Sequence, residues 1–143
     1  MKIALASDHG GYLLKEDVKS YLSEKGYEVV DCGTNSLESC NYPVYARLAS
    51  KKVSSGECEF GFVICTTGEG VSITANKEKG IRCGIGFNED VIHLLREHNN
   101  CNMMAMGAKY TTSEEAHKYI DIFLSTPFAG GRHQIRVDLI EEK

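Results

Sequence analysis

Residues Phe60 to Lys77 read FGFVICTTGEGVSITANK and carry the clearest fold signal in the chain. The first six residues of this stretch form an apolar run of the length of one buried strand. The segment TTGEG that follows is rich in threonine and glycine, which favour a loop, and the residues from Gly70 to Lys77 can form a helix. A buried strand, a short loop and a helix in succession indicate one unit of a parallel α/β sheet.

The same alternation continues on both sides of this stretch. Gly26 is a natural stop for a first helix, Pro43 suits the first turn of another, and Thr112 with Glu115 forms a capping-box pattern. Apolar runs of strand length lie between the helical segments. We predict further strands at Lys2–Ser7, Tyr27–Asp31, Ile81–Gly86 and Asn102–Gly107, and further helices at Tyr12–Lys25, Pro43–Val53, Asn88–His98, Thr112–Leu124 and Arg132–Glu141.

Strands that alternate with helices require right-handed crossovers, and these produce a parallel sheet that is covered on both faces. We therefore predict the α/β class, a doubly wound, Rossmann-like five-stranded parallel sheet with helices on both faces. Residues 1–143 form a single predicted domain, because the sequence shows no internal repeat and no long linker. In such sheets, ligands bind beyond the carboxyl ends of the strands, where the strand order reverses.

Composition excludes several classes of function. The formal net charge is -4 and the basic residues are dispersed, which argues against a nucleic-acid partner. No apolar run approaches the roughly 20 residues that cross a bilayer, and the N-terminus resembles no secretory signal. We therefore expect a cytoplasmic protein with no membrane partner, whose ligand is a small molecule.

The cysteines argue against a metal site. They form no C-x-x-C pair and no other spacing typical of metal ligands. In a cytoplasmic chain, most of them should be reduced and should act as small buried apolar residues. The six are Cys32, Cys40, Cys58, Cys65, Cys83 and Cys101.

The loop after the strand at 60–65 can bind an anion. Residues such as Thr67, Gly68 and Gly70 lead into a helix N-terminus, where free backbone N–H groups and the positive end of the helix dipole favour negative charge. The loop matches neither the phosphate-binding pattern G-x-x-x-x-G-K-[ST] nor the dinucleotide pattern G-x-G-x-x-G. No nucleotide is therefore implied.

Three residues near strand ends have two interpretations each. Cys65 could be a structural cysteine at the end of a buried strand, or a thiolate that the neighbouring N–H donors favour. Asp8 could simply cap the first helix, and His9, which follows it, could be part of that tight turn or face a phosphate. Position alone does not separate these alternatives.

Basic residues in the second half of the chain are equally ambiguous. His98 ends a predicted helix, where a histidine commonly interacts with the helix dipole. Arg132 and Arg136 are four residues apart and therefore lie on one helical face, behind a Gly-Gly turn. Such a pair is usually solvated, but two guanidinium groups can also bind a phosphate dianion.

Five separated motifs resemble those of ribose-5-phosphate isomerase B and its relatives, in order and over essentially the whole chain. They are SDHGG (7–11), NYP (41–43), CTTGEGVSITANKxxGIR (65–82), REHNN (96–100) and GGRHxxRV (130–137). The resemblance implies a homodimer or homotetramer with active sites at subunit interfaces, and no metal or organic cofactor. In one arrangement of such a site, His98 and the arginine pair come from different chains.

The same resemblance implies roles for individual residues. Cys65 would be the base that moves the carbon-bound proton, and His98 would act in ring opening. Arg132, Arg136 and His9 would surround the phosphate. Thr67 completes the predicted catalytic group, and the other predicted substrate contacts are Asp8, Tyr42, Gly68, Gly70, Ser72 and Asn99.

The loop departs from the family pattern in two places. The usual form is C-G-T-G, an apolar residue and G, whereas this chain has Thr66 and Glu69. A branch of the family uses a glutamate at the position of Val71 instead of the cysteine, so this chain resembles the cysteine branch. We expect the side chain of Glu69 to face solvent or a basic partner such as Lys77 or Lys79.

The substrate expected from the resemblance is ribose 5-phosphate, which would be converted to ribulose 5-phosphate through an enediolate held by the N–H groups of residues 67–71. Relatives act on allose 6-phosphate or galactose 6-phosphate, and two features keep a hexose phosphate open. Asn41 stands where an aspartate is usual, and the tail at 130–139 is similar to a galactose-6-phosphate isomerase subunit. A non-catalytic sugar-phosphate binding domain is the remaining alternative.

Overall fold

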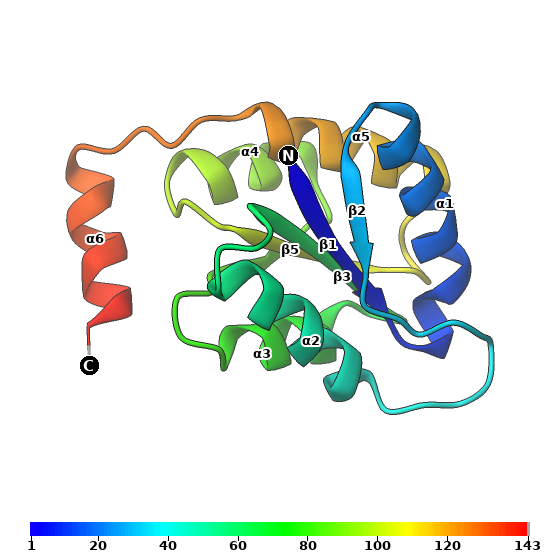
Figure 1. Cartoon of the computed structure of the whole chain (residues 1–143). Coiled ribbons are helices and arrows are strands. Elements are labelled where there is room, and N and C mark those ends of the chain that lie inside the picture. The colour runs from blue at the N-terminus through cyan, green and yellow to red at the C-terminus, as the bar shows by residue number, and fades with distance from the viewer. Residues whose placement is uncertain (143) are drawn as a thin grey trace.

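The computed structural model describes residues 1–142 and contains the predicted parallel sheet. All its strand pairs are parallel, and the spatial order of the strands is β2-β1-β3-β5-β4. Figure 1 labels four of them, β2, β1, β3 and β5. The strands are β1 (Lys2–Ser7), β2 (Glu28–Asp31), β3 (Phe60–Cys65), β4 (Cys83–Ile85) and β5 (Met103–Gly107).

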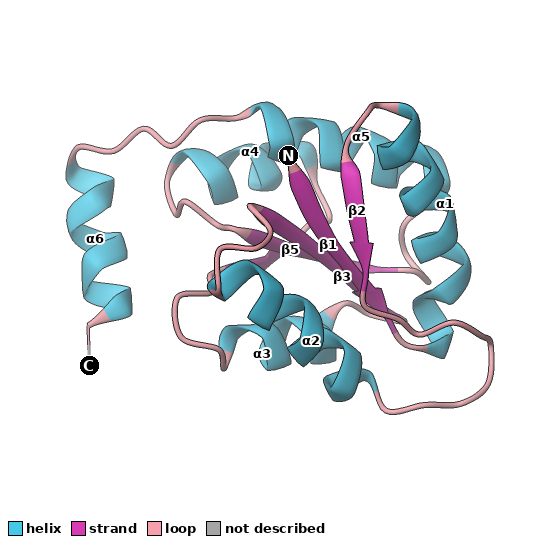
Figure 2. Ribbon diagram, in the orientation of Figure 1, coloured by secondary structure: helices cyan, strands magenta, loops and turns pink. Residues whose placement is uncertain are grey.

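Helices connect the strands, as Figure 2 shows. Asn88 accepts from the N–H groups of Asp90 and Val91 at the start of α4, and Thr112 and Glu115 form the predicted capping box at the start of α5. The elements are η1 (His9–Gly11), α1 (Tyr12–Glu24), α2 (Tyr42–Ser54), α3 (Glu69–Asn76), α4 (Glu89–Glu97), α5 (Ser113–Ser125) and α6 (Arg132–Glu141).

The sheet has a buried core on each face, which confirms the doubly wound α/β prediction. On one face, large side chains such as Ile64 and Met104 pack against α1, α4 and α5. On the other face, small residues such as Ala4 and Ala105 pack against α2 and α3. Neighbouring residues of a strand point to opposite faces, so both layers are encoded in the same short apolar runs. Among residues 1–142, none of the helices combines the length and apolar character that a bilayer crossing needs.

The last helix, α6, stands apart from these two layers. A linker carries the chain away from α5 before α6 begins (Figure 1, red). Val137 is buried against the rest of the chain, whereas Ile135 and Leu139 are exposed. Most of α6 is therefore free to meet another molecule.

The strand order fixes where a ligand should bind. The chain moves outward from β1 to β2 on one side, and from β3 towards β5 and β4 on the other. The order therefore reverses between β1 and β3, and the segments that follow these two strands flank the switch point.

Candidate active site

The loops after β1 and β3 line an open cavity at the carboxyl ends of the strands. The backbone N–H of Asp8 donates to the carbonyl of Ile64 at 3.3 Å, which joins the first loop to the end of β3. The cavity has a volume of about 410 Å³. It is lined by Asp8, Tyr42, Cys65, Thr66, Thr67, Glu69, Gly70 and Ile73.

Cys65 lies at the base of this cavity and is 6% exposed. Its Sγ accepts a hydrogen bond from the backbone N–H of Gly68 at 3.1 Å. Gly68 adopts a φ of 83°, and a Cβ there would lie 3.0 Å from the carbonyl carbon of Met106. A side chain at this position would disturb the loop, so glycine is needed to aim the N–H at the sulfur. A donor in this position favours the thiolate form.

Two further N–H groups of the loop are available to a ligand. Thr67 Oγ1 accepts from the N–H of Glu69 at 3.2 Å, and the N–H of Ser72 donates to the Gly68 carbonyl at 3.2 Å. Within residues 1–142, no hydrogen-bond acceptor is found for the N–H groups of Gly70 and Val71. Both belong to the first turn of α3, where the helix dipole also favours an anion.

Tyr42 and Ser72 differ in how they relate to the cavity. The ring of Tyr42 packs over Gly70, where an added Cβ would lie 2.5 Å from the ring. This close approach places an aromatic wall beside the free N–H of Gly70. The hydroxyl of Ser72 instead donates to the Cys83 carbonyl at 3.4 Å, so the structure gives that side chain a partner in the protein interior.

His9 is oriented by a loop that follows β2. Its Nδ1 accepts a hydrogen bond from the backbone N–H of Cys40 at 3.1 Å. In the neutral ring the proton is then on Nε2, so Nε2 is the donor. Asp8 caps the same turn, because its Oδ1 accepts from the Gly11 N–H at 3.1 Å.

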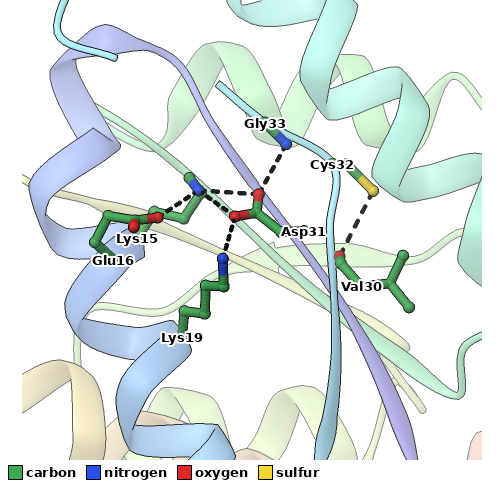
Figure 3. Close-up of polar contacts among 7 residues, drawn as sticks. All are labelled: Lys15, Glu16, Lys19, Val30, Asp31, Cys32 and Gly33. Atoms are coloured by element: carbon green, nitrogen blue, oxygen red, sulfur yellow. Dashed lines mark hydrogen bonds and ion pairs between the residues drawn. The ribbon is translucent and has the colours of Figure 1, made fainter. Parts of the chain in front are cut away.

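A buried ion pair fixes the start of this loop, and the sequence alone did not predict it. The Lys15 ammonium is fully buried and donates to both oxygens of Asp31, at 2.9 and 2.8 Å (Figure 3). Asp31 also accepts from the Gly33 N–H at 2.9 Å and from Lys19 at 3.0 Å. Burial alone would raise the pKa of Asp31, but the hydrogen bonds from Lys15, Gly33 and Lys19 outweigh it and lower that pKa below its ordinary value.

A second cluster contains the other predicted residues. His98 follows α4, and its ring stacks on that of His133 with centroids 4.1 Å apart and planes 11° apart. Arg132 and Arg136 flank His133 on α6. Burial lowers the pKa of His133, and the positive charges of His98 and the two arginines lower it further. His133 was missed as a site residue, although it stands inside the motif GGRHxxRV.

The two clusters lie at opposite ends of the sheet. Cys65 ends β3, whereas His98 and Asn99 precede β5 at the amino ends of the strands. The six residues of β3 span roughly 16 Å at 3.3 Å per residue, so one chain does not bring the clusters together. Within one chain, the stack on His133 places His98 beside the helix that carries the arginine pair, and the arrangement in which they serve one site from different chains stays a prediction.

Of the two surroundings expected for the Glu69 side chain, solvent and a basic partner, the structure has the first. Glu69 is exposed, and within residues 1–142 no ion pair joins it to Lys77 or Lys79. It lines the cavity at Cys65 and also a neighbouring cavity of about 360 Å³. Glu69 therefore lies between two neighbouring cavities.

The remaining cysteines show no metal-binding arrangement. All six are free, and no group of three potential metal ligands occurs among the described residues. Burial raises the pKa of Cys83 to about 12 and that of Cys101 to about 11. Both thiols are therefore protonated and unreactive near neutral pH.

Comparisons with known proteins agree with this geometry. The sequence profile of the family "Ribose/Galactose Isomerase" matches residues 3–140. Ribose-5-phosphate isomerase B of Escherichia coli is 42% identical over 139 residues, which cover 97% of this chain and 93% of that protein.

Solved structures of similar proteins have the same fold. The structure of a ribose 5-phosphate isomerase from Thermotoga maritima matches with a TM-score of 0.97 and 46% identity, over 99% of this chain and 98% of that chain. Ribose-5-phosphate isomerase B from Mycoplasma genitalium, solved with bound ribulose-5-phosphate, matches with a TM-score of 0.93 and 38% identity, over 98% and 93% of the two chains.

Proposed function

This chain belongs to the ribose/galactose isomerase family and is a sugar-phosphate isomerase, and on that premise we propose that it interconverts ribose 5-phosphate and ribulose 5-phosphate through an enediolate, without a cofactor. The observation that carries the proposal is the 3.1 Å hydrogen bond from the Gly68 N–H to Cys65 Sγ at the base of the cavity. It supports a thiolate at the switch point of the sheet, beside unused anion donors.

The chemistry follows from these positions. The Cys65 thiolate takes the proton from C2 of the open-chain aldose, and the electron pair of that C–H bond forms the C1–C2 double bond of the enediolate. The negative charge moves to oxygen, where the N–H groups of Gly70 and Val71 and the Thr67 hydroxyl can donate to it. Preorganised donors of this kind typically contribute about 3 kcal/mol each. The proton of the C2 hydroxyl then moves to the oxygen on C1, the proton held by Cys65 returns to C1, and C2 becomes the carbonyl carbon of the ketose.

Ring opening and phosphate binding are assigned to the second cluster. A neutral imidazole has one ring nitrogen that donates a proton and one that accepts a proton, so His98 can pass a proton from the hydroxyl on C1 to the ring oxygen. Arg132 and Arg136 present two guanidinium groups on one helical face, and Asn99 lies beside His98. His9 donates from Nε2, which suits a phosphate or a sugar oxygen next to Asp8.

Each site requires two chains. The cluster around Cys65 and the cluster around His98 are at opposite ends of one sheet, so the second must come from another copy. The exposed outer side of α6 supports such an exchange, since α6 carries both arginines. We therefore expect a homodimer, or a homotetramer built from such dimers.

The experiment is a turnover assay of the purified protein in the presence of a chelator. Ribose 5-phosphate, allose 6-phosphate and galactose 6-phosphate are supplied separately, and ketose formation is measured. The highest kcat/KM should be for ribose 5-phosphate. Preference for a hexose phosphate would reassign the substrate, and binding without turnover would instead support a sugar-phosphate sensor.

The six free thiols are consistent with a reaction in the cytoplasm.

A further inference from the structure

The geometry of the second cluster depends on how α6 is attached to the rest of the chain. Arg132, His133 and Arg136 are on α6, whereas His98 and Asn99 lie in the turn that follows α4. The two elements must keep a fixed relative position if they are to act on one ligand. Yet α6 stands apart from the layered core, with Val137 as its buried residue (Figure 1).

Arg82, which precedes β4, contacts both elements. Its Nε donates to the Asn99 carbonyl at 3.1 Å, and its Nη2 donates to the Asn100 carbonyl at 2.8 Å. Its Nη1 lies 3.4 Å from Oε1 of Glu141, in the last turn of α6. The side chain is 15% exposed, so these contacts are partly shielded from water.

The turn that contains Asn99 and Asn100 needs these hydrogen bonds because of its backbone conformation. Asn100 adopts a φ of 47°, a left-handed conformation that is uncommon outside glycine. Its side-chain oxygen accepts from Arg96 Nη1 at 3.0 Å, while its carbonyl accepts from Arg82. Arg96 is itself buried and lies 4.9 Å from the ring centroid of Phe60. The turn after His98 is thus held on the inner side by Arg96 and on the outer side by Arg82.

We propose that Arg82 is a positioning residue for the second cluster, because it links the His98 turn to α6 and so sets where His98 lies relative to Arg132 and Arg136. The planar guanidinium reaches three oxygens on two elements at once. A lysine ammonium is a single point charge and does not reproduce this fork. Arg82 does not touch the substrate in this account, and its role rests on the proposed function of the cluster.

The test compares Arg82→Met, Arg82→Lys and Glu141→Gln with Lys118→Met as the matched control. Lys118 also forms an ion pair of 3.4 Å, with Glu89, and its removal changes the charge equally. Arg82→Met should lower kcat/KM for the sugar phosphate by at least about tenfold, because hydrogen bonds from a charged group to both elements are lost. Glu141→Gln frees only α6, so it should raise KM by about two- to fivefold while kcat stays unchanged.

Histidine ring signals in NMR spectra provide a readout that needs no turnover. In the wild-type oligomer, the His98 and His133 signals should carry the ring-current shifts of a stacked pair. Arg82→Met should move the chemical shifts of both rings towards those of free imidazole. If the wild type isomerises no sugar phosphate, the proposed function fails, and these signals still decide the role of Arg82.

The proposal is overturned if Arg82→Met leaves both ring signals and KM as in Lys118→Met. If Arg82→Met does not fold, Arg82→Lys and Glu141→Gln decide instead. An unchanged KM and an unchanged His133 signal in both of those variants would equally overturn it.

Discussion

The backbone N–H of Gly68 donates to Cys65 Sγ at 3.1 Å, although the two residues are only three positions apart in the loop. The left-handed φ of Gly68 turns this N–H back towards the end of β3. The sulfur is therefore held where it faces the cavity, with a donor that favours its negative charge. The following predictions depend on this pair or on the second cluster.

Cys65→Ala should lower kcat by about 10²- to 10⁴-fold, the usual contribution of a general base. Its affinity for the sugar phosphate should change little, because the thiolate acts on carbon and contributes little to ground-state binding. Turnover is measured by ketose formation and binding by calorimetry. Near wild-type turnover in the variant would remove Cys65 from the role of base.

Iodoacetamide should alkylate Cys65 first and stop turnover. Cys83 and Cys101 should remain unmodified in the native protein, because burial raises their pKa to about 12 and about 11. Peptide mass mapping identifies the modified residue, and bound sugar phosphate should slow its modification. Faster labelling of the half-buried Cys40 would contradict the assignment.

Co-expression of Cys65→Ala and Arg136→Ala chains should restore activity. Each variant is inactive alone, but a mixed dimer contains one site in which both clusters are intact. Random pairing should give about a quarter of the wild-type activity in a two-fold symmetric dimer.

The matched control for this mixture is His98→Ala with Arg136→Ala. Both changes affect the same cluster, so every site keeps a defect and no activity should return. Recovery in the control mixture, or none in the first mixture although mixed dimers form, would contradict the shared site.

The Lys15–Asp31 pair should make stability depend on acidity. The pKa of Asp31 is lowered in the folded chain, so its contribution is present above its unfolded pKa of about 3.9 and is lost as pH falls through the lower folded value. Asp31→Asn should cost about 3 kcal/mol at pH 7, because the fully buried Lys15 ammonium then keeps only the carboxylate of Glu16 as an ionised partner.

Urea unfolding between pH 7 and pH 3 measures this dependence. The difference in the free energy of unfolding between wild type and Asp31→Asn should shrink below about pH 4. A constant difference over the whole range would show that the carboxylate charge is not responsible.

Glu69→Gln should change kcat by less than about tenfold, or 1.4 kcal/mol. The side chain is exposed at the border of two cavities, where water screens its charge. The assay uses pentose and hexose phosphates in parallel. A loss of a hundredfold, or a changed preference among these sugars, would mean that the loop is built for another substrate.

Local patterns were enough to predict the sheet and the residues nearest to it. Apolar runs and helix signals depend on neighbours along the chain, so the strands, the capping box of Thr112 and the switch-point loops could be predicted. Cys65, Thr67 and Gly70 lie together because they follow one strand. The order of strands then brought Asp8 to the same cavity.

Contacts between residues distant in sequence were decided only by the tertiary structure. The stack of His98 on His133, the buried pair of Lys15 with Asp31, and the link from Arg82 to Glu141 join segments that carry no mutual signal in the sequence. The separation of Cys65 from His98 was likewise decided only by the tertiary structure. Which groups could do the chemistry was readable from the amino-acid sequence, because side-chain type and strand period are local properties. The fold decided that these groups lie at opposite ends of one sheet, because a helix that connects parallel strands returns the chain to the other end.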